Sequence, residues 1–133
     1  MLIALDLSAV LASWPLLVRG VVWTIGLTIV GTVLGLLLGT ACAWARARNL
    51  GHRPAALRWA VACYVELVRN TPFIVQLFFL FFGLPALGLK LSPEFASVLA
   101  MVINLGAYSA EIIRAGIEAT PRGQIEAAHS LAL

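Results

Sequence analysis

Charged residues are scarce in this chain, and lysine is almost absent. Only 11% of the 133 residues are charged, whereas 62% are hydrophobic. Soluble domains usually carry about 25% charged and about 45–50% apolar residues. A soluble domain of this size could not bury so much apolar surface, so the composition indicates a protein that lies in a lipid bilayer.

The shortage of lysine and histidine argues against several functions. Lys90 is the only lysine, and it follows Leu89 rather than the glycine of a phosphate-binding Gly-Lys-Ser/Thr loop. His52 and His129 lie far apart in the sequence, and they suggest no catalytic set with serine and aspartate. The net charge of +3 comes from arginines at the edges of apolar runs, so we expect no nucleic-acid partner. We expect no catalytic residues and no enzyme activity in this chain.

Cysteine is also scarce. Cys42 and Cys63 lie in apolar segments without a Cys-x-x-Cys or Cys/His spacing. We therefore expect two small apolar residues rather than metal ligands, and the sequence indicates no bound metal or cofactor.

Three long apolar segments are present, and we predict transmembrane helices at about 20–45, 59–82 and 95–115. The first has no charge, and at about 1.5 Å per residue it would span about 39 Å, more than the hydrocarbon core of about 30 Å. Glu111, near the end of the third segment, must lie near a membrane face or inside a helix bundle.

The arginines predict the orientation. The connection between the first two segments contains Arg46, Arg48, Arg53 and Arg58, whereas the next connection contains Lys90 balanced by Glu94. Arginine-rich loops stay in the cytoplasm. We therefore place the first loop inside, the N-terminus outside and the chain after residue 115 in the cytoplasm.

Glycines in the first segment predict close helix packing. Gly31, Gly35 and Gly39 are four residues apart, a spacing that lets two membrane helices approach closely. The alternative is that glycine is simply common in membrane helices.

Polar residues interrupt the second segment. Glu66 and Arg69 are three residues apart and can pair, and on a continuous helix they share one sector with Asn70 and Gln76. Pro72 should kink this helix. Two interpretations remain open, namely a buried ion pair with a packing kink, or a polar wall along a transport pathway.

The third segment carries a polar stripe. Ser97, Asn104 and Glu111 follow one another at spacings of seven, with Tyr108 beside them, so the stripe should face a bundle interior. It could serve helix–helix hydrogen bonding or face a substrate. Gln76 and Asn104 have no obvious local partner, so both are candidates for a transport route.

The tail predicts a short cytoplasmic helix. Thr120 followed by Pro121 is typical of a helix N-cap and first residue. Glu126 then falls in the early turns, where the helix dipole favours a carboxylate. Ala127 and Ala128 give this helix a narrow face.

Three stretches of the sequence carry a family resemblance. Residues 66–79 contain a Glu, then an Arg and a Thr-Pro, then a Val-Gln and several phenylalanines. Residues 106–117 run from Gly106 to Ile117 through Tyr108 and Glu111, and residues 121–128 match the start of the cytoplasmic Glu-Ala-Ala motif. From Gly20 to its end the chain resembles the membrane subunits of binding-protein-dependent ABC importers for polar amino acids, such as histidine, glutamine and arginine permeases.

The resemblance implies an all-α integral membrane bundle of three transmembrane helices plus a cytoplasmic coupling helix within 118–133. It implies a permease subunit in the bacterial inner membrane that forms half of a translocation pathway and is an N-terminal fragment of a five-helix permease. The expected partners are an ATP-binding cassette subunit that uses the ATP, a second permease subunit of the same or a homologous kind, an extracytoplasmic solute-binding protein and a polar amino acid. The alternatives are a structural or regulatory membrane protein and a passive channel.

The polar faces of the second and third segments give the pathway hypothesis its residues, which are Glu66, Arg69, Asn70, Gln76, Asn104, Tyr108 and Glu111. The resemblance adds a role for the tail. The segment that would dock on the ATP-binding subunit contains Gly123, Gln124, Glu126, Ala127 and Ala128. One departure is Ala132, which stands where the motif has a glycine suited to a left-handed helix end.

Overall fold

The computed structural model describes residues 8–46 and 54–131, and every element in these ranges is a helix. The elements are α1 (Ser8–Ala12), α2 (Trp14–Arg46), α3 (Ala55–Arg69), α4 (Phe73–Phe78), the π-helix η1 (Phe79–Gly83), α5 (Leu84–Ala86), α6 (Pro93–Glu118) and α7 (Arg122–Ser130). The predicted all-α fold is confirmed for this part of the chain. Arg48 and Arg53 of the first predicted loop, and Ala132, lie outside the described residues.

Two of these helices, α2 and α6, are long and apolar enough to cross a membrane. They contain the first and third predicted segments, 20–45 and 95–115. Helix α3 is too short to cross a membrane alone, and so is the run from Phe73 to Ala86. Together they are long and apolar enough, but the two parts are bent by 105° relative to each other. The described chain thus has two candidate spans, or three if the bent pair counts as one.

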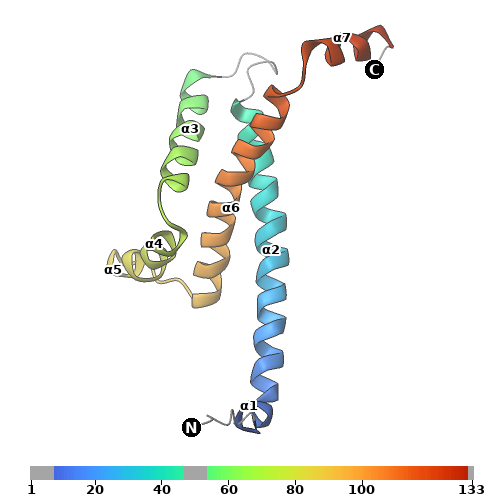
Figure 1. Cartoon of the computed structure of the whole chain (residues 1–133). Helices are drawn as coiled ribbons and strands as arrows, with labels where there is room; N and C mark the ends of the chain where they lie inside the picture. The colour runs from blue at the N-terminus through green and yellow to red at the C-terminus, as the bar shows by residue number, and fades with distance from the viewer. Residues whose placement is uncertain (1–7, 47–53, 132–133) are drawn as a thin grey trace, which may run out of the picture.

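Helices α2 and α6 lie side by side (Figure 1) and meet through small residues. A Cβ atom on Gly39 would lie 2.5 Å from the Cβ of Ser109 and 2.9 Å from the carbonyl oxygen of Gly106. A Cβ on Gly35 would lie 2.9 Å from the Cβ of Leu105. The two backbones therefore approach as closely as glycine allows, and van der Waals contact of this kind stabilises helix pairs in lipid.

Helix α3 completes a small core against this pair. The buried residues that meet there are Cys42 of α2, Val65 and Val68 of α3, and Ala107 and Ala110 of α6. The hydroxyl of Tyr64 on α3 donates a hydrogen bond of 2.6 Å to the carbonyl oxygen of Ile103 on α6. The core thus lies in the half of α2 that ends at Arg46.

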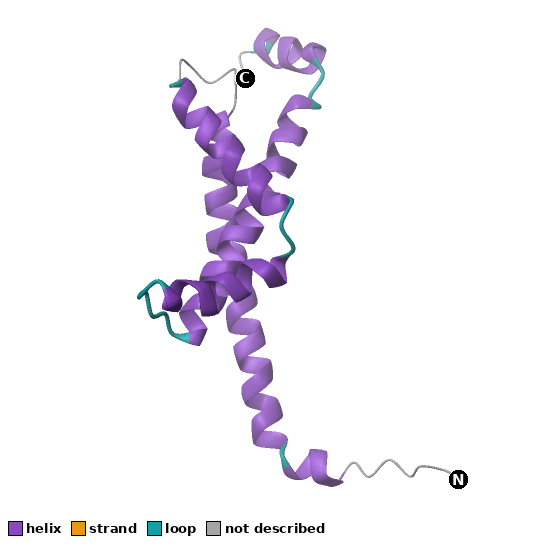
Figure 2. Cartoon of the chain, turned by 90° about the vertical axis from the view of Figure 1, so that its left-hand side faces the viewer, coloured by secondary structure: helices purple, strands orange, loops and turns teal. Residues whose placement is uncertain are grey.

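The second predicted segment, 59–82, differs from the single kinked helix expected from Pro72. Helix α3 ends at Arg69, and Pro72 has the extended ψ of 139° that precedes α4. Proline lacks an N–H, and it disfavours helical geometry at the residue before it, here Thr71. The chain therefore breaks rather than kinks, and the helices that follow lie across the bundle (Figure 2).

The other half of α2 extends beyond its neighbours (Figure 2). Large apolar side chains there are exposed, and Leu16, Val22 and Ile25 are each more than half accessible. An apolar surface of this extent fits contact with lipid or with further membrane helices.

The short helix of the tail begins later than predicted. Its N-cap is Pro121, without a side-chain hydrogen bond, and α7 starts at Arg122. Thr120 is not the cap, because its hydroxyl instead donates to the carbonyl oxygen of Gly116 at 3.3 Å. The hydroxyl of Thr120 thus binds a carbonyl at the end of α6 rather than the first N–H groups of α7, to which the sequence assigned it.

Candidate functional site

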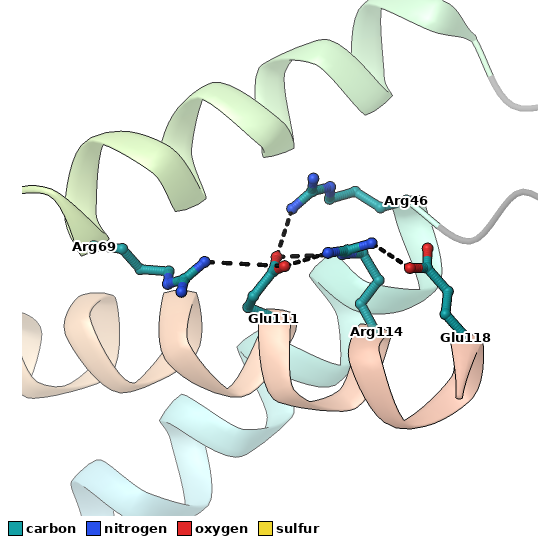
Figure 3. A network of polar contacts seen from close by, with 5 residues as sticks. All are labelled: Arg46, Arg69, Glu111, Arg114 and Glu118. Carbon is teal, nitrogen blue, oxygen red and sulfur yellow. Dashed lines mark hydrogen bonds and ion pairs between the residues drawn. The ribbon is translucent and has the colours of Figure 1, made fainter. Parts of the chain in front are cut away.

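A cluster of charged side chains joins α2, α3 and α6 around one carboxylate (Figure 3). We call it the Glu111 cluster, and its members are Arg46, Arg69, Glu111, Arg114 and Glu118. Arg46 donates to Glu111 at 3.2 Å, and Arg69 lies 3.9 Å from the other carboxylate oxygen. Arg114 contacts both oxygens of Glu111 from one turn along α6 and also pairs with Glu118. A single acidic side chain therefore connects three helices.

The balance of charge in the Glu111 cluster is uneven. Three guanidinium groups face two carboxylates, which leaves a formal excess of one positive charge. Glu111 is only 21% exposed, so its charge would be costly without these partners. The arginines are 22% to 44% exposed, which indicates that water reaches the cluster from one side. This arrangement suits a place at a membrane face or along an aqueous cavity.

Arg69 does not pair with Glu66 as its spacing predicts. Its guanidinium reaches α6 instead, where it lies near Glu111 and 5.9 Å from the centre of the Tyr108 ring. That distance allows a cation–π interaction. The tertiary partners on α6 therefore displace the local partner on α3.

Gln76 joins the two halves of the broken segment. Its amide nitrogen donates at 2.8 Å to the carbonyl oxygens of Val68 and Thr71, and its amide oxygen accepts from Asn104 at 3.3 Å. Pro72 cannot donate to Val68, and Gln76 supplies the missing donor. Neither residue was expected to have a local partner, and Gln76 and Asn104 instead bind each other across 28 residues of sequence.

The residues that the sequence placed in one sector do not share one site in the structure. Arg69 of α3 contacts Glu111 and Tyr108 of α6, and Gln76 of α4 contacts Asn104 of α6 in a second, separate set. Glu66 and Asn70 instead line a separate cleft of about 460 Å³ with Trp59, Ala62, Cys63, Leu67 and Thr71. The break at Pro72 removes only Gln76 from the predicted sector, whereas Arg69 departs from Glu66 and Asn70 because its side chain turns toward Glu111 and Tyr108 on α6.

The predicted coupling residues all lie on α7 (Arg122–Ser130). Gly123, Gln124, Glu126 and Ala127 are exposed, and Ala128 is partly buried. Figure 1 shows α7 set apart from the bundle, beyond the end of α6. The helix is therefore accessible to another protein.

Arg46 and Arg114 belong to the site, although the sequence did not single them out as site residues. Arg46 was interpreted as a signal of membrane orientation, because it stands at the end of an apolar segment. Glu111 could have predicted them, because an acidic residue in an apolar helix requires a cationic partner from a neighbouring segment.

Metal binding has no support in residues 8–46 and 54–131, where no three His, Cys, Asp or Glu side chains are grouped as ligands. The carboxylates of the Glu111 cluster are engaged by guanidinium groups instead.

Residues 35–133 match the protein family described as binding-protein-dependent transport system inner membrane component. The chain is 42% identical over 120 residues to the L-cystine transport system permease protein TcyB of Bacillus subtilis. This aligned region covers 90% of this chain and 50% of that protein. It is 37% identical over 128 residues to the arginine transport system permease protein ArtQ of Bacillus subtilis, with 96% of this chain and 57% of that protein covered. The chain thus spans about half the length of the curated relatives it matches.

A solved structure has the same fold. The crystal structure of an amino acid ABC transporter with histidines aligns with a TM-score of 0.83 and 34% sequence identity. The alignment covers 98% of this chain and 59% of the other. The arrangement of α2, α3 and α6 is therefore shared with a chain of that transporter.

Proposed function

This chain belongs to the family of binding-protein-dependent transport system inner membrane components, and from that premise we propose that it forms part of a permease subunit in an ATP-driven importer of polar amino acids. The observation that carries the proposal is the likeness to an amino acid ABC transporter over 98% of the chain. Relatives named for L-cystine and arginine transport support amino acids as the substrate class. A separate subunit would hydrolyse the ATP, since the chain carries no phosphate-binding Gly-Lys-Ser/Thr loop.

The transport route in this proposal follows the polar residues between α3, α4 and α6. Arg69 and Tyr108 contact each other, and so do Gln76 and Asn104, so these helices offer a cation with a phenol and a pair of carboxamides. A guanidinium group suits the carboxylate of an amino acid. Glu66 and Asn70, in their own cleft, would serve the ammonium group or a neighbouring subunit.

The proposal places the end of α2, the start of α3 and all of α7 on the cytoplasmic side. The arginines near these ends support this orientation. Helix α7 would dock on the ATP-binding subunit, and its exposure supports this role. A second permease subunit would complete the pathway, and a solute-binding protein would deliver the amino acid on the opposite side.

Reconstituted transport tests the function. The permease would be purified with its ATP-binding subunit, reconstituted into liposomes and supplied with its solute-binding protein. We expect uptake of radiolabelled cystine, arginine, glutamine or histidine that requires ATP. Uptake that is equally fast without ATP would favour a passive channel, and the absence of any co-purifying ATPase would favour a structural membrane protein.

A further inference from the structure

A second charged feature lies beside the Glu111 cluster. A cleft of about 470 Å³, here called the arginine cleft, opens between the end of α2, the first turns of α3 and the last turns of α6. Its lining residues are Arg46, Ala55, Arg58, Trp59, Ala62, Arg114 and Glu118. Three guanidinium groups and one carboxylate therefore face the same space.

The arginines in this cleft are not equally engaged. Arg46 and Arg114 bind carboxylates of the Glu111 cluster (Figure 3). Arg58 is exposed, and its guanidinium forms no hydrogen bond or ion pair with the residues that the structure describes. Within residues 8–46 and 54–131, Arg58 therefore has no counter-ion, and it lies beside two arginines whose remaining N–H groups can donate to an anion.

The non-charged lining indicates the depth of the cleft in the membrane. Trp59 lines the cleft and is 75% exposed, and tryptophan favours the level of the lipid headgroups. Ala55 and Ala62 give the same cleft an apolar wall. A ligand that fits must carry negative charge at one end and tolerate an apolar surface beside it.

We propose that the arginine cleft binds the headgroup phosphate of an anionic phospholipid. Basic pockets between membrane helices on the cytoplasmic side bind such headgroups, and arginine pairs with phosphate through two parallel N–H donors. The glycerol and upper acyl chains would then lie against Trp59 and the alanines. A carboxylate from a partner protein would satisfy Arg58, but it would not account for the exposed tryptophan and the apolar wall. This site does not depend on the transported substrate, so it stands or falls separately from the proposed function.

Trp59 serves as the probe for this site. In a variant with Trp14, Trp23 and Trp44 changed to Phe, the remaining tryptophan reports on the cleft. This variant would be placed in vesicles of phosphatidylcholine and phosphatidylglycerol, in which either lipid carries bromine on its upper acyl chains. We expect brominated phosphatidylglycerol to quench Trp59 more strongly than brominated phosphatidylcholine at the same mole fraction.

Two arginine variants identify the group responsible. In the same background, Arg58→Ala should reduce the preference for phosphatidylglycerol about fivefold, since one arginine near an anionic surface contributes about 1 kcal/mol. Arg58→Lys should retain most of the preference, and Arg19→Ala, at the other end of α2, should leave it unchanged. Far-ultraviolet circular dichroism would show that each variant keeps its helices.

Three results would overturn the proposal. One is equal quenching by the two brominated lipids. Another is an Arg58→Ala variant that keeps the full preference. The third is an Arg19→Ala variant that loses as much of the preference as Arg58→Ala, because the preference would then arise from overall positive charge rather than from the cleft.

Discussion

At the scale of single residues, Gln76 takes over a task that Pro72 cannot perform. A helix through this region would use the N–H of residue 72 to satisfy the carbonyl of Val68, and proline has none. The amide of Gln76 donates to that carbonyl at 2.8 Å and holds Asn104 through its oxygen. One side chain thus stabilises the break and attaches it to α6.

Replacing Gln76 with Leu should therefore weaken both the fold and transport. The carbonyl of Val68 keeps only the N–H of Thr71, at 3.3 Å, and the carbonyl of Thr71 and the amide of Asn104 lose their hydrogen bonds to Gln76, which costs about 1–2 kcal/mol in a membrane protein. Thermal unfolding in detergent, followed by circular dichroism, measures the loss. Ser97→Ala is the matched control, because that hydroxyl donates within its own helix to Pro93, and it should change stability by less than about 0.5 kcal/mol. Equal midpoints for the two variants would contradict this assignment.

The two carboxylates of the Glu111 cluster should differ in importance. Glu111 contacts Arg46, Arg69 and Arg114, so Glu111→Gln leaves three arginines with too little negative charge and should destabilise by about 1–3 kcal/mol. Glu118 is 58% exposed and contacts one arginine among the described residues, so Glu118→Gln should cost less than about 1 kcal/mol.

The salt dependence of unfolding distinguishes these two variants further. The wild-type chain and Glu118→Gln should lose stability as ionic strength rises, because salt screens the ion pairs. Glu111→Gln should gain stability in salt, since screening relieves the repulsion among its arginines. The same salt response in both variants would show that Glu111 is not the centre of the cluster.

At the scale of helices, the close contact of α2 with α6 depends on position along α2. A Cβ on Gly39 would collide with Ser109 and with backbone of α6, whereas a Cβ on Gly26 meets nothing within 4 Å. Gly39→Ala should therefore destabilise by about 1–3 kcal/mol through overpacking. Gly26→Ala should be neutral or stabilise by up to about 1 kcal/mol, because alanine favours helix. Thermal unfolding in detergent compares them, and a pair of equal shifts would disprove the close contact.

The sequence could predict the elements better than their junctions. The apolar segments around 20–45 and 95–115 have their own length and composition, and both are contained in long helices. The spacing of polar residues also predicted that Asn104, Tyr108 and Glu111 lie on one helix. Such properties belong to a single segment, so they are visible without tertiary structure.

What could not be predicted depends on contacts between segments. Arg69 has a local partner in Glu66 and a tertiary one in Glu111, and spacing alone cannot rank the two. Gln76 was assigned to the same helix as Glu66, because a kink and a 105° bend look alike in sequence. Thr120 was given to the helix after it rather than the helix before it, since its hydroxyl can serve either end.

Helix α7 provides an element-scale test of coupling. If α7 docks in a groove of the ATP-binding subunit, Ala128→Trp should overpack that contact at a cost of about 1–3 kcal/mol and weaken co-purification of the subunit. Glu126→Arg should do the same if a basic residue faces it. His129→Trp, at the exposed neighbouring position, is the control for bulk alone. Normal ATPase binding by both Ala128→Trp and Glu126→Arg would exclude docking through α7.

At the scale of the whole molecule, the orientation can be read from cysteine labelling. In a background of Cys42→Ala and Cys63→Ala, a cysteine in place of Asn49 should resist an impermeant thiol reagent in intact cells, because arginine-rich loops stay inside. A cysteine in place of Lys90 should react readily. The reverse pattern would invert the topology and would move the proposed coupling helix to the wrong side.

The tight fit between α2 and α6 also determines where this molecule can change shape. The close fit of Gly39 against the backbone of α6 resists sliding of one helix on the other, so we expect α2 and α6 to move together. Asn70, Thr71 and Pro72 have no such constraint, and the amide of Gln76 holds their junction through a few hydrogen bonds. We therefore expect this junction to be the point at which α4, η1 and α5 move most easily relative to α2 and α6.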